Sequence, residues 1–248
     1  MKLLVVGGAG LVAGLVLPIL ALNHELHIYD LKQPKHPELA SIPFTQGDVC
    51  DPDTLALACR DQEALLYMAM GTQNWEKAEA AASAFDASVK GVYFALETAN
   101  AAGIHHAVYT SSLSVYEGIP PTLTQTDDTN SRFYRDEEMT MDATHFYGVT
   151  KRLGEEVCRI AARVHGMSIN ALRLCHPMPE PKWQEEPQPT IATTSEDTAR
   201  ALLAALDYRG DGFEAFMISG DYDQKLMNMS KARRALGWEP LARPQKQS

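Results

Sequence analysis

Residues 2–14 read KLLVVGGAGLVAG, and this stretch decides the fold class. Its first half is a short apolar run, which is typical of a strand covered on both faces of a sheet. Its second half holds Gly7, Gly8, Gly10 and Gly14, and glycines weaken a helix or strand unless something must approach the backbone closely. The stretch is therefore either a cradle for phosphate groups or a buried strand followed by a turn of small residues.

The rest of the chain alternates apolar runs with helical periodicity. Strands are predicted at 2–7, 25–30, 64–70, 105–112 and 168–174, with another inside 42–49 and a return strand near 213–218. Helices are predicted at 10–22, where Pro18 should kink or shorten the helix, and at 51–60, 75–101 and 144–165. Such alternation implies βαβ crossovers. We expect an α/β fold, a Rossmann-type doubly wound parallel sheet.

In this context the glycines match the fingerprint of a dinucleotide site, with the spacing Gly7-x-x-Gly10-x-x-Ala13. The first glycine allows a tight turn, the second lets a pyrophosphate reach the backbone, and the small third residue lets the helix pack close to the strand. The N–H groups at the start of the helix, including those of Leu11 and Val12, would face the phosphates. The cradle is the favoured interpretation.

Asp30 supports that interpretation. It ends the second predicted strand 20 residues after Gly10, where a carboxylate can accept hydrogen bonds from ribose hydroxyls. Its charge would repel a 2′-phosphate, so NAD is the expected cofactor, although the neighbouring Lys32 leaves NADP open. We therefore expect an NAD-binding Rossmann domain over 1–176 and a small substrate-binding lobe, packed on it, over 177–248, with the return strand counted in the lobe.

Tyr147 and Lys151 stand four residues apart in HFYGVTKRLGEE (145–156), within the predicted helix 144–165. Residues at this spacing share a helix face, so a phenol and an ammonium can point into one pocket. A nearby cation favours the phenolate, which makes the tyrosine usable as an acid or base. The strand 105–112 ends in hydroxyls, at the edge where open α/β sheets bind ligands. These hydroxyls belong to Ser111, Ser112 and Ser114.

Composition excludes several classes of protein. The formal net charge of -10 argues against a nucleic-acid partner. The four cysteines show no metal-ligand spacing, so we expect no metal site and reduced thiols in a cytoplasmic protein. No apolar run approaches the length of a membrane span, and glycines interrupt the apolar N-terminus too early for a signal peptide.

Six blocks, in order, resemble the extended short-chain dehydrogenase/reductase superfamily, in its NAD-dependent epimerase/dehydratase group. They are GGAGLVAG (7–14), GDVCDPDTL (47–55), GVYFALETANAAGIHHAVYTSSLSVY (91–116), YGVTKRLGEE (147–156), ALRLCHP (171–177) and SKARRALGWEP (230–240). The resemblance implies that Tyr147 is the acid/base, that Lys151 binds the nicotinamide ribose and favours the phenolate, and that Ser112 is the catalytic serine.

The same resemblance implies further binding residues. Asp48 and Val49 would flank the adenine, Ala69 and Met70 would line the cofactor, and Pro177 would pack near the nicotinamide. Ser114 and His176 are candidate substrate contacts. A small-molecule substrate and a homodimer, formed by the helices 75–101 and 144–165, are expected partners.

Departures from the superfamily pattern narrow the reaction. Leu113 and Ser114 replace the Asp-Glu pair of the dehydratases, which argues against dehydration. His176 replaces an asparagine common in nucleotide-sugar enzymes, and Ser88 replaces another in the long helix. The tail, with HPMPEP (176–181), a Thr194-x-x-Asp197 helix start and LGWEP (236–240), resembles the compact uronate dehydrogenases. In that resemblance His176 or Arg173 would face a carboxylate, although Arg173 occurs widely in the superfamily.

The leading hypothesis is an NAD-dependent oxidoreductase acting on a sugar or sugar acid. The alternative is a sugar or nucleotide-sugar epimerase that keeps its NAD tightly bound, and a non-catalytic NAD(P)-sensing protein is a third possibility. The irregular segment 117–143 is expected to be a functional loop. Its acids are expected to form a solvated surface: Asp127, Asp128, Asp136, Glu137, Glu138 and Asp142.

Overall fold

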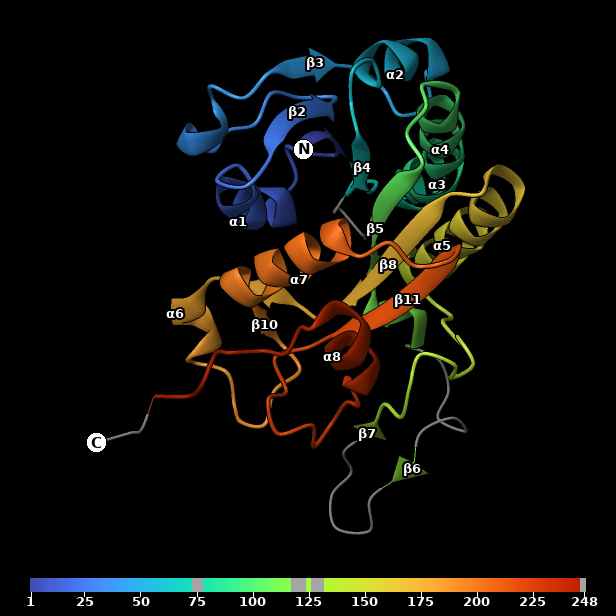
Figure 1. Ribbon diagram of the computed structural model, residues 1–248. Helices are drawn as coiled ribbons and strands as arrows, with labels where there is room; N and C mark the ends of the chain where they lie inside the picture. The colour runs from blue at the N-terminus through green and yellow to red at the C-terminus, as the bar shows by residue number, and fades with distance from the viewer. Residues whose placement is uncertain (73–77, 117–123, 126–131, 246–248) are drawn as a thin grey trace.

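The computed structural model describes residues 1–72, 78–116, 124–125 and 132–245 (Figure 1). Much of the loop predicted over 117–143 therefore lies outside the described residues, together with its acids Asp127 and Asp128. The remainder forms one layered α/β arrangement.

The main sheet has seven strands in the order β11-β8-β5-β4-β1-β2-β3, and every neighbouring pair is parallel. This topology confirms the predicted doubly wound parallel sheet. The strands are β1 (Lys2–Val6), β2 (Glu25–Asp30), β3 (Phe44–Gln46), β4 (Ala64–Tyr67), β5 (His106–Ser112), β8 (Ser168–Leu174) and β11 (Phe213–Ile218). Two short pairs lie apart from it, β6 (Thr124–Gln125) with β7 (Arg132–Phe133) and β9 (Pro177–Met178) with β10 (Thr193–Thr194).

Helices cover both faces of this sheet. They are α1 (Leu11–Leu20), α2 (Pro52–Ala58), α3 (Ala78–Phe85), α4 (Gly91–Ala101), α5 (Phe146–His165), α6 (Glu180–Trp183), α7 (Ser195–Asp207) and α8 (Ser230–Leu236), with short 3-10 turns at Pro37–Leu39 and Leu113–Tyr116. Because strand side chains alternate, Leu3 and Val5 face one core layer while Leu4 and Val6 face the other. The apolar run in β1 is thus explained by burial on both sides.

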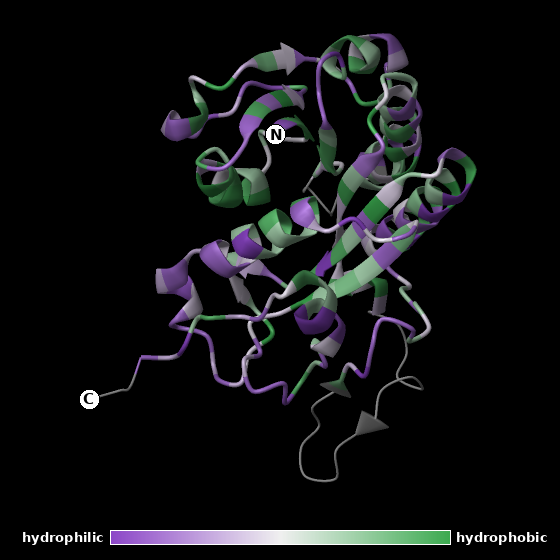
Figure 2. Ribbon diagram, viewed as in Figure 1, coloured by the Kyte–Doolittle hydropathy of each residue, from purple (hydrophilic) through white to green (hydrophobic). Residues whose placement is uncertain are grey.

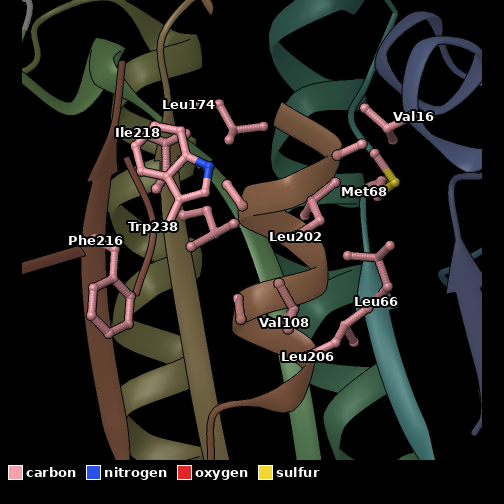
Figure 3. Packing of buried hydrophobic residues seen from close by; sticks show 14 of the residues in the cluster. Val16, Leu66, Met68, Val108, Leu174, Leu202, Leu206, Phe216, Ile218 and Trp238 are labelled. Atoms are coloured by element: carbon pink, nitrogen blue, oxygen red, sulfur yellow. The ribbon is translucent and has the colours of Figure 1, made fainter. Parts of the chain in front are cut away.

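The first core layer lies between the sheet and α1, α7 and α8. Figure 3 shows Leu202 and Leu206 of α7 pointing toward Val108 and Leu66 of the sheet, with Trp238 closing the layer over β11. The second layer packs α2, α4 and α5 on the opposite face. Figure 2 shows the matching pattern, with mostly hydrophobic colouring on the central strands and α1 and more hydrophilic colouring on the peripheral segments.

The long helix predicted over 75–101 is interrupted. Residues 73–77 lie outside the described part, and α3 joins α4 through a π-helical turn over Asp86–Lys90. Inside this turn the Tyr67 hydroxyl donates to the Ala87 carbonyl at 2.5 Å. The carbonyl thereby gains a partner from the sheet, a tertiary contact that helical periodicity does not reveal. Pro18 lies inside α1, and the helix ends at Leu20, two residues before its predicted end.

The strand predicted near 213–218 is present, but its place in the lobe is corrected. β11 pairs with β8 along its whole length, from Phe213 opposite Ile169 to Ile218 opposite Leu174, so it is the edge strand of the main sheet. The short sheet β9–β10, α6, α8 and the tail make up the rest of 177–245. The division into a domain over 1–176 and a lobe over 177–248 remains a prediction.

Two tail motifs meet at Asp197. Thr194 caps α7 by accepting from the Asp197 N–H at 3.1 Å, and the buried Asp197 carboxylate accepts from the Leu241 and Ala242 N–H groups at 3.0 Å. The Trp238 indole N–H donates to the Asp197 carbonyl at 3.0 Å. The Thr-x-x-Asp start of α7 and the LGWEP segment therefore form one clasp, called the tail clasp below, that binds residues 238–242 to α7.

Candidate functional site

The glycine-rich turn joins β1 to the N-terminus of α1. Gly7 has φ +87°, and a Cβ there would lie 2.3 Å from the Ala69 nitrogen, so the fold itself requires this glycine. Gly10 is different, because a Cβ there would meet nothing closer than the Gly7 carbonyl at 3.4 Å. Gly10 is the N-cap of α1, and no side chain caps the N–H groups that follow it. The protein's own packing leaves this turn open, as a cradle for a pyrophosphate requires.

Asp30 lies beside the cradle at the end of β2. Its Oδ2 accepts from the Ala9 N–H at 2.9 Å and its Oδ1 from the Lys32 N–H at 3.2 Å. These bonds fix the carboxylate at the wall of a cavity of about 360 Å³. The predicted cofactor residues Val49, Ala69 and Met70 line the same cavity.

A second cavity of about 210 Å³ adjoins the first at the carboxyl edge of the sheet. The two cavities share Gly7, Gly10, Leu11, Met68 and Met70, so they form a continuous trench over the glycine-rich turn. The second cavity brings together seven further predicted residues of the site: Val12, Ser112, Ser114, Tyr147, Lys151, His176 and Pro177. An open cradle, a carboxylate at the cavity wall and two adjoining cavities fit an extended dinucleotide with a substrate at one end.

Lys151 reaches the floor of the second cavity from α5. Its side chain is buried, its Nζ donates to the Thr110 carbonyl at 2.7 Å, and the ammonium lies 5.9 Å from the centre of the Tyr147 ring. Burial lowers the pKa of this ammonium to about 8, while Cys158 and Glu155 act weakly in the opposite direction. The phenol and the ammonium therefore share one pocket, as their spacing predicts.

The two adjacent serines at the end of β5 have different partners. Ser111 Oγ donates to Glu155 Oε1 at 2.6 Å and is committed to the protein. Ser112 Oγ accepts from the Ser114 N–H at 3.1 Å, which leaves its proton available to a ligand. Of the two, Ser112 is the serine equipped to contact a substrate.

A buried ion pair lies behind these side chains. Arg173 Nε donates to Glu155 Oε1 at 2.9 Å and Nη2 to Glu155 Oε2 at 2.7 Å. Arg173 Nη1 donates to the Tyr116 hydroxyl and to the Glu137 carbonyl. The guanidinium is 2% exposed and fully engaged, so it does not line either cavity. Arg173 joins β8 to α5 and is not available to a substrate carboxylate.

Some predicted residues lie elsewhere. The Asp48 side chain is exposed, accepts from the Cys50 N–H at 2.9 Å and lines neither the first nor the second cavity. Glu137 departs from the expected solvated acidic surface, because it is 8% exposed and accepts from the Met217 N–H of β11 at 2.9 Å. Desolvation raises the pKa of its carboxyl. Asp136 and Glu138 on either side of it are exposed.

Other cavity residues have no motif to reveal them. Thr110 belongs to no sequence motif, and only the contact of its carbonyl with Lys151 Nζ identifies it as part of the site. Leu31, Gln33 and Lys35 follow Asp30 and line the first cavity, so their position after the acidic end of β2 is the only available signal. Within the described residues, no cluster of three or more His, Cys, Asp or Glu side chains could hold a metal ion. No described helix is long and apolar enough to span a membrane.

Comparison with known proteins agrees with this geometry. The sequence model of the NAD dependent epimerase/dehydratase family matches residues 3–212. A UDP-glucose 4-epimerase from Lactobacillus helveticus is 27% identical over 178 residues, which are 70% of this chain and 51% of that protein. The chain thus spans about half the length of this curated relative.

Solved structures with the same fold cover nearly the whole chain. A short-chain dehydrogenase/reductase superfamily protein from Agrobacterium tumefaciens with bound NAD has a TM-score of 0.78 at 18% identity, covering 98% of this chain and 93% of that one. A mutated uronate dehydrogenase has a TM-score of 0.76 at 19% identity, covering 97% and 82%.

Proposed function

Because the chain belongs to the NAD-dependent epimerase/dehydratase family, within the extended short-chain dehydrogenase/reductase superfamily of enzymes, we propose that it is an NAD-dependent oxidoreductase of a sugar or sugar acid. The observation that carries this proposal is the meeting of Ser112, Tyr147 and Lys151 in a cavity that adjoins the open cradle. A phosphate cradle alone would serve a sensor, but a serine, a phenol and an ammonium in one cavity supply an acid/base site.

The cofactor would lie along the two joined cavities. Gly10 and the uncapped start of α1 would hold its pyrophosphate, and Asp30 would accept from the adenosine ribose. The carboxylate favours NAD over NADP, because a 2′-phosphate would meet a like charge. When bound, NAD supplies the acceptor for the substrate hydride.

The chain's own side chains handle the proton. Tyr147 would take the proton of the substrate hydroxyl on its phenolic oxygen, and Ser112 would orient the substrate oxygen with its free hydroxyl proton. The ammonium of Lys151 would favour the phenolate form of Tyr147 and bind the nicotinamide ribose. Ser114 and His176 lie in the same cavity and are proposed to contact the rest of the substrate.

The class of substrate is inferred from the basic side chains that line the second cavity. Arg173 is occupied by Glu155, so apart from Lys151 the basic side chain that lines this cavity within the described residues is His176. His176 has φ +41°, a conformation that costs free energy in a residue other than glycine. The turn that holds it is fixed where the Thr193 N–H donates to the Cys175 carbonyl at 3.0 Å. We propose that this imidazole contacts the polar end of a sugar or sugar acid.

The alternative function is a sugar or nucleotide-sugar epimerase with tightly bound NAD, and the likeness to a UDP-glucose 4-epimerase favours it. An epimerase returns the hydride to its substrate, whereas a dehydrogenase releases NADH. The two are distinguished by denaturing freshly purified protein and measuring the nucleotide it releases. Stoichiometric bound NAD would support the epimerase, and little bound nucleotide would support the dehydrogenase.

Replacement of Tyr147 tests the assignment of the site. We expect Tyr147→Phe to lower turnover by about 10²–10⁴-fold, because the phenylalanine cannot take a proton, while NAD affinity stays within about twofold. Stopped-time assays would measure turnover, and calorimetric titration would measure NAD affinity. An unchanged rate would contradict the proposed acid/base role.

We further propose a cytoplasmic homodimer. Four free cysteines support the compartment. The faces of α4 and α5 support the dimer, because Tyr93 and Ile160 line a groove and are 50% and 43% exposed, and Val164 of α5 is 63% exposed. Sedimentation should give twice the 27.3 kDa of one chain, and Ile160→Asp should give the single-chain mass. A wild-type mass of one chain would contradict the dimer.

A further inference from the structure

The ammonium of Lys151 is buried without a carboxylate partner. Its side chain is 2% exposed, and the one hydrogen bond of its Nζ within the described residues goes to the Thr110 carbonyl. Burying a charge is costly unless another group compensates it. The acid closest along α5, Glu155, follows one helical turn later, but its two oxygens are taken by Arg173 and Ser111.

Two aromatic rings face the ammonium instead. Lys151 Nζ lies 5.0 Å from the centre of the Tyr109 ring and 5.9 Å from that of Tyr147. Tyr147 is part of the proposed reaction, whereas Tyr109 lies in β5, is 1% exposed and touches neither cavity. Burial raises the pKa of the Tyr109 phenol well above its ordinary value, so this ring is a neutral π-surface at every working pH. Such a surface attracts a cation.

The packing around Tyr109 leaves space for its ring. A Cβ at Gly154 of α5 would lie 2.3 Å from the Tyr109 hydroxyl, so this glycine leaves room for the end of the ring. The hydroxyl itself has no hydrogen-bond partner in the described structure. The ring is therefore held by its packing and not by a hydrogen bond of its hydroxyl.

We propose that Tyr109 is a positioning residue, whose ring holds the Lys151 ammonium beneath the cavity in place of a carboxylate. The role rests on the proposed function, because it matters to a reaction that needs Lys151 charged and in place. The engagement of the Glu155 carboxylate by Arg173, which keeps it from pairing with Lys151, is part of the same arrangement. By binding Glu155, Arg173 prevents an ion pair that would draw Lys151 away from Tyr147 along α5.

The other groups around Lys151 are accounted for. On α5 these are Tyr147, Glu155 and Cys158, and burial keeps the Cys158 thiol neutral by raising its pKa. On β8, Arg173 is paired with Glu155. On β4, the Tyr67 ring lies 6.1 Å from that of Tyr109, and burial raises the pKa of its phenol as well. Of the two aromatic rings that face the ammonium, Tyr109 is the closer one, at 5.0 Å against 5.9 Å for Tyr147.

The test is a titration of Lys151 in the cofactor-free protein. Lysines carrying ¹³C at the ε position are followed by NMR from pH 6.5 to 10.5, and the Lys151 signal is assigned by its absence in Lys151→Arg. In Tyr109→Leu the pKa of Lys151 should fall by about one unit, because the ring no longer favours the charged form. Tyr109→Phe keeps the ring and should titrate as the wild type does. Tyr109→Met replaces the leucine variant if the latter does not fold.

Equal titration of Lys151 in the wild-type, phenylalanine and ring-free proteins would overturn the proposal. The kinetic counterpart is the alkaline limb of the pH–rate profile, which should move to lower pH in Tyr109→Leu and stay in place in Tyr109→Phe. The NMR titration needs neither substrate nor NAD. A wild-type protein without turnover would therefore count against the proposed function alone.

Discussion

At the residue scale, the site depends on which polar side chains are committed to the protein and which are left for a ligand. Glu155 takes the Ser111 hydroxyl and the Arg173 guanidinium, while Ser112 keeps its proton for the cavity. The three hydroxyls at the end of β5 are visible in the sequence. The division of tasks among them is not, because it is decided by Glu155, 44 positions away from Ser111.

This division predicts different outcomes for two neighbouring variants. Ser112→Ala should lower kcat/KM by about 10²–10³-fold through loss of the hydrogen bond that orients the substrate oxygen, with little change in stability. Ser111→Ala should lower the free energy of unfolding by about 1–2 kcal/mol, because Glu155 loses a buried partner. Steady-state kinetics and urea unfolding of both variants would measure the contrast. A larger kinetic loss in Ser111→Ala would contradict the assignment of the catalytic serine.

At the element scale, the periodicity predicts the central strands and helices to within a few residues, because burial on one or both faces determines it. β4 is shorter than expected, and the π-helical turn over Asp86–Lys90 is missed. The turn follows from the Tyr67 contact with the Ala87 carbonyl. Glu137 is missed for a similar reason, since its acceptor role toward Met217 joins residues 80 positions apart.

The tail clasp gives a prediction at this scale. Asp197→Ala removes the acceptor of the Leu241 and Ala242 N–H groups and the ion-pair partner of Arg200. We expect the free energy of unfolding to fall by about 2–3 kcal/mol. The Leu241 and Ala242 amides should also exchange with deuterium much faster. The matched control is Asp207→Ala, an exposed acid at the other end of α7, which should leave both amides protected.

Exchange that stays slow at Leu241 and Ala242 in Asp197→Ala would show that the clasp does not hold the tail. The sequence alone indicates the Thr-x-x-Asp and LGWEP motifs but not their meeting, because 41 positions separate Asp197 from Trp238. Only the packing of α7 on the sheet brings them together.

At the scale of the whole molecule, the parallel sheet brings the ends of β1, β2, β4, β5 and β8 to one edge, where the two cavities lie. This convergence could be predicted, because parallel strands joined by helices place their carboxyl ends together. The place of β11 could not, because an edge strand and a strand of a separate lobe have the same apolar pattern. Whether the protein acts as a dehydrogenase or as an epimerase depends on whether the hydride leaves the site with the cofactor or returns to the substrate.

The most direct measurement is the near-ultraviolet absorbance of reduced nicotinamide, with purified protein, NAD and a panel of aldoses, uronic acids and nucleotide sugars. We predict net NADH, stoichiometric with one substrate class, and none in Tyr147→Phe. Conversion of a nucleotide sugar into its epimer without net NADH would contradict the account and establish the epimerase instead.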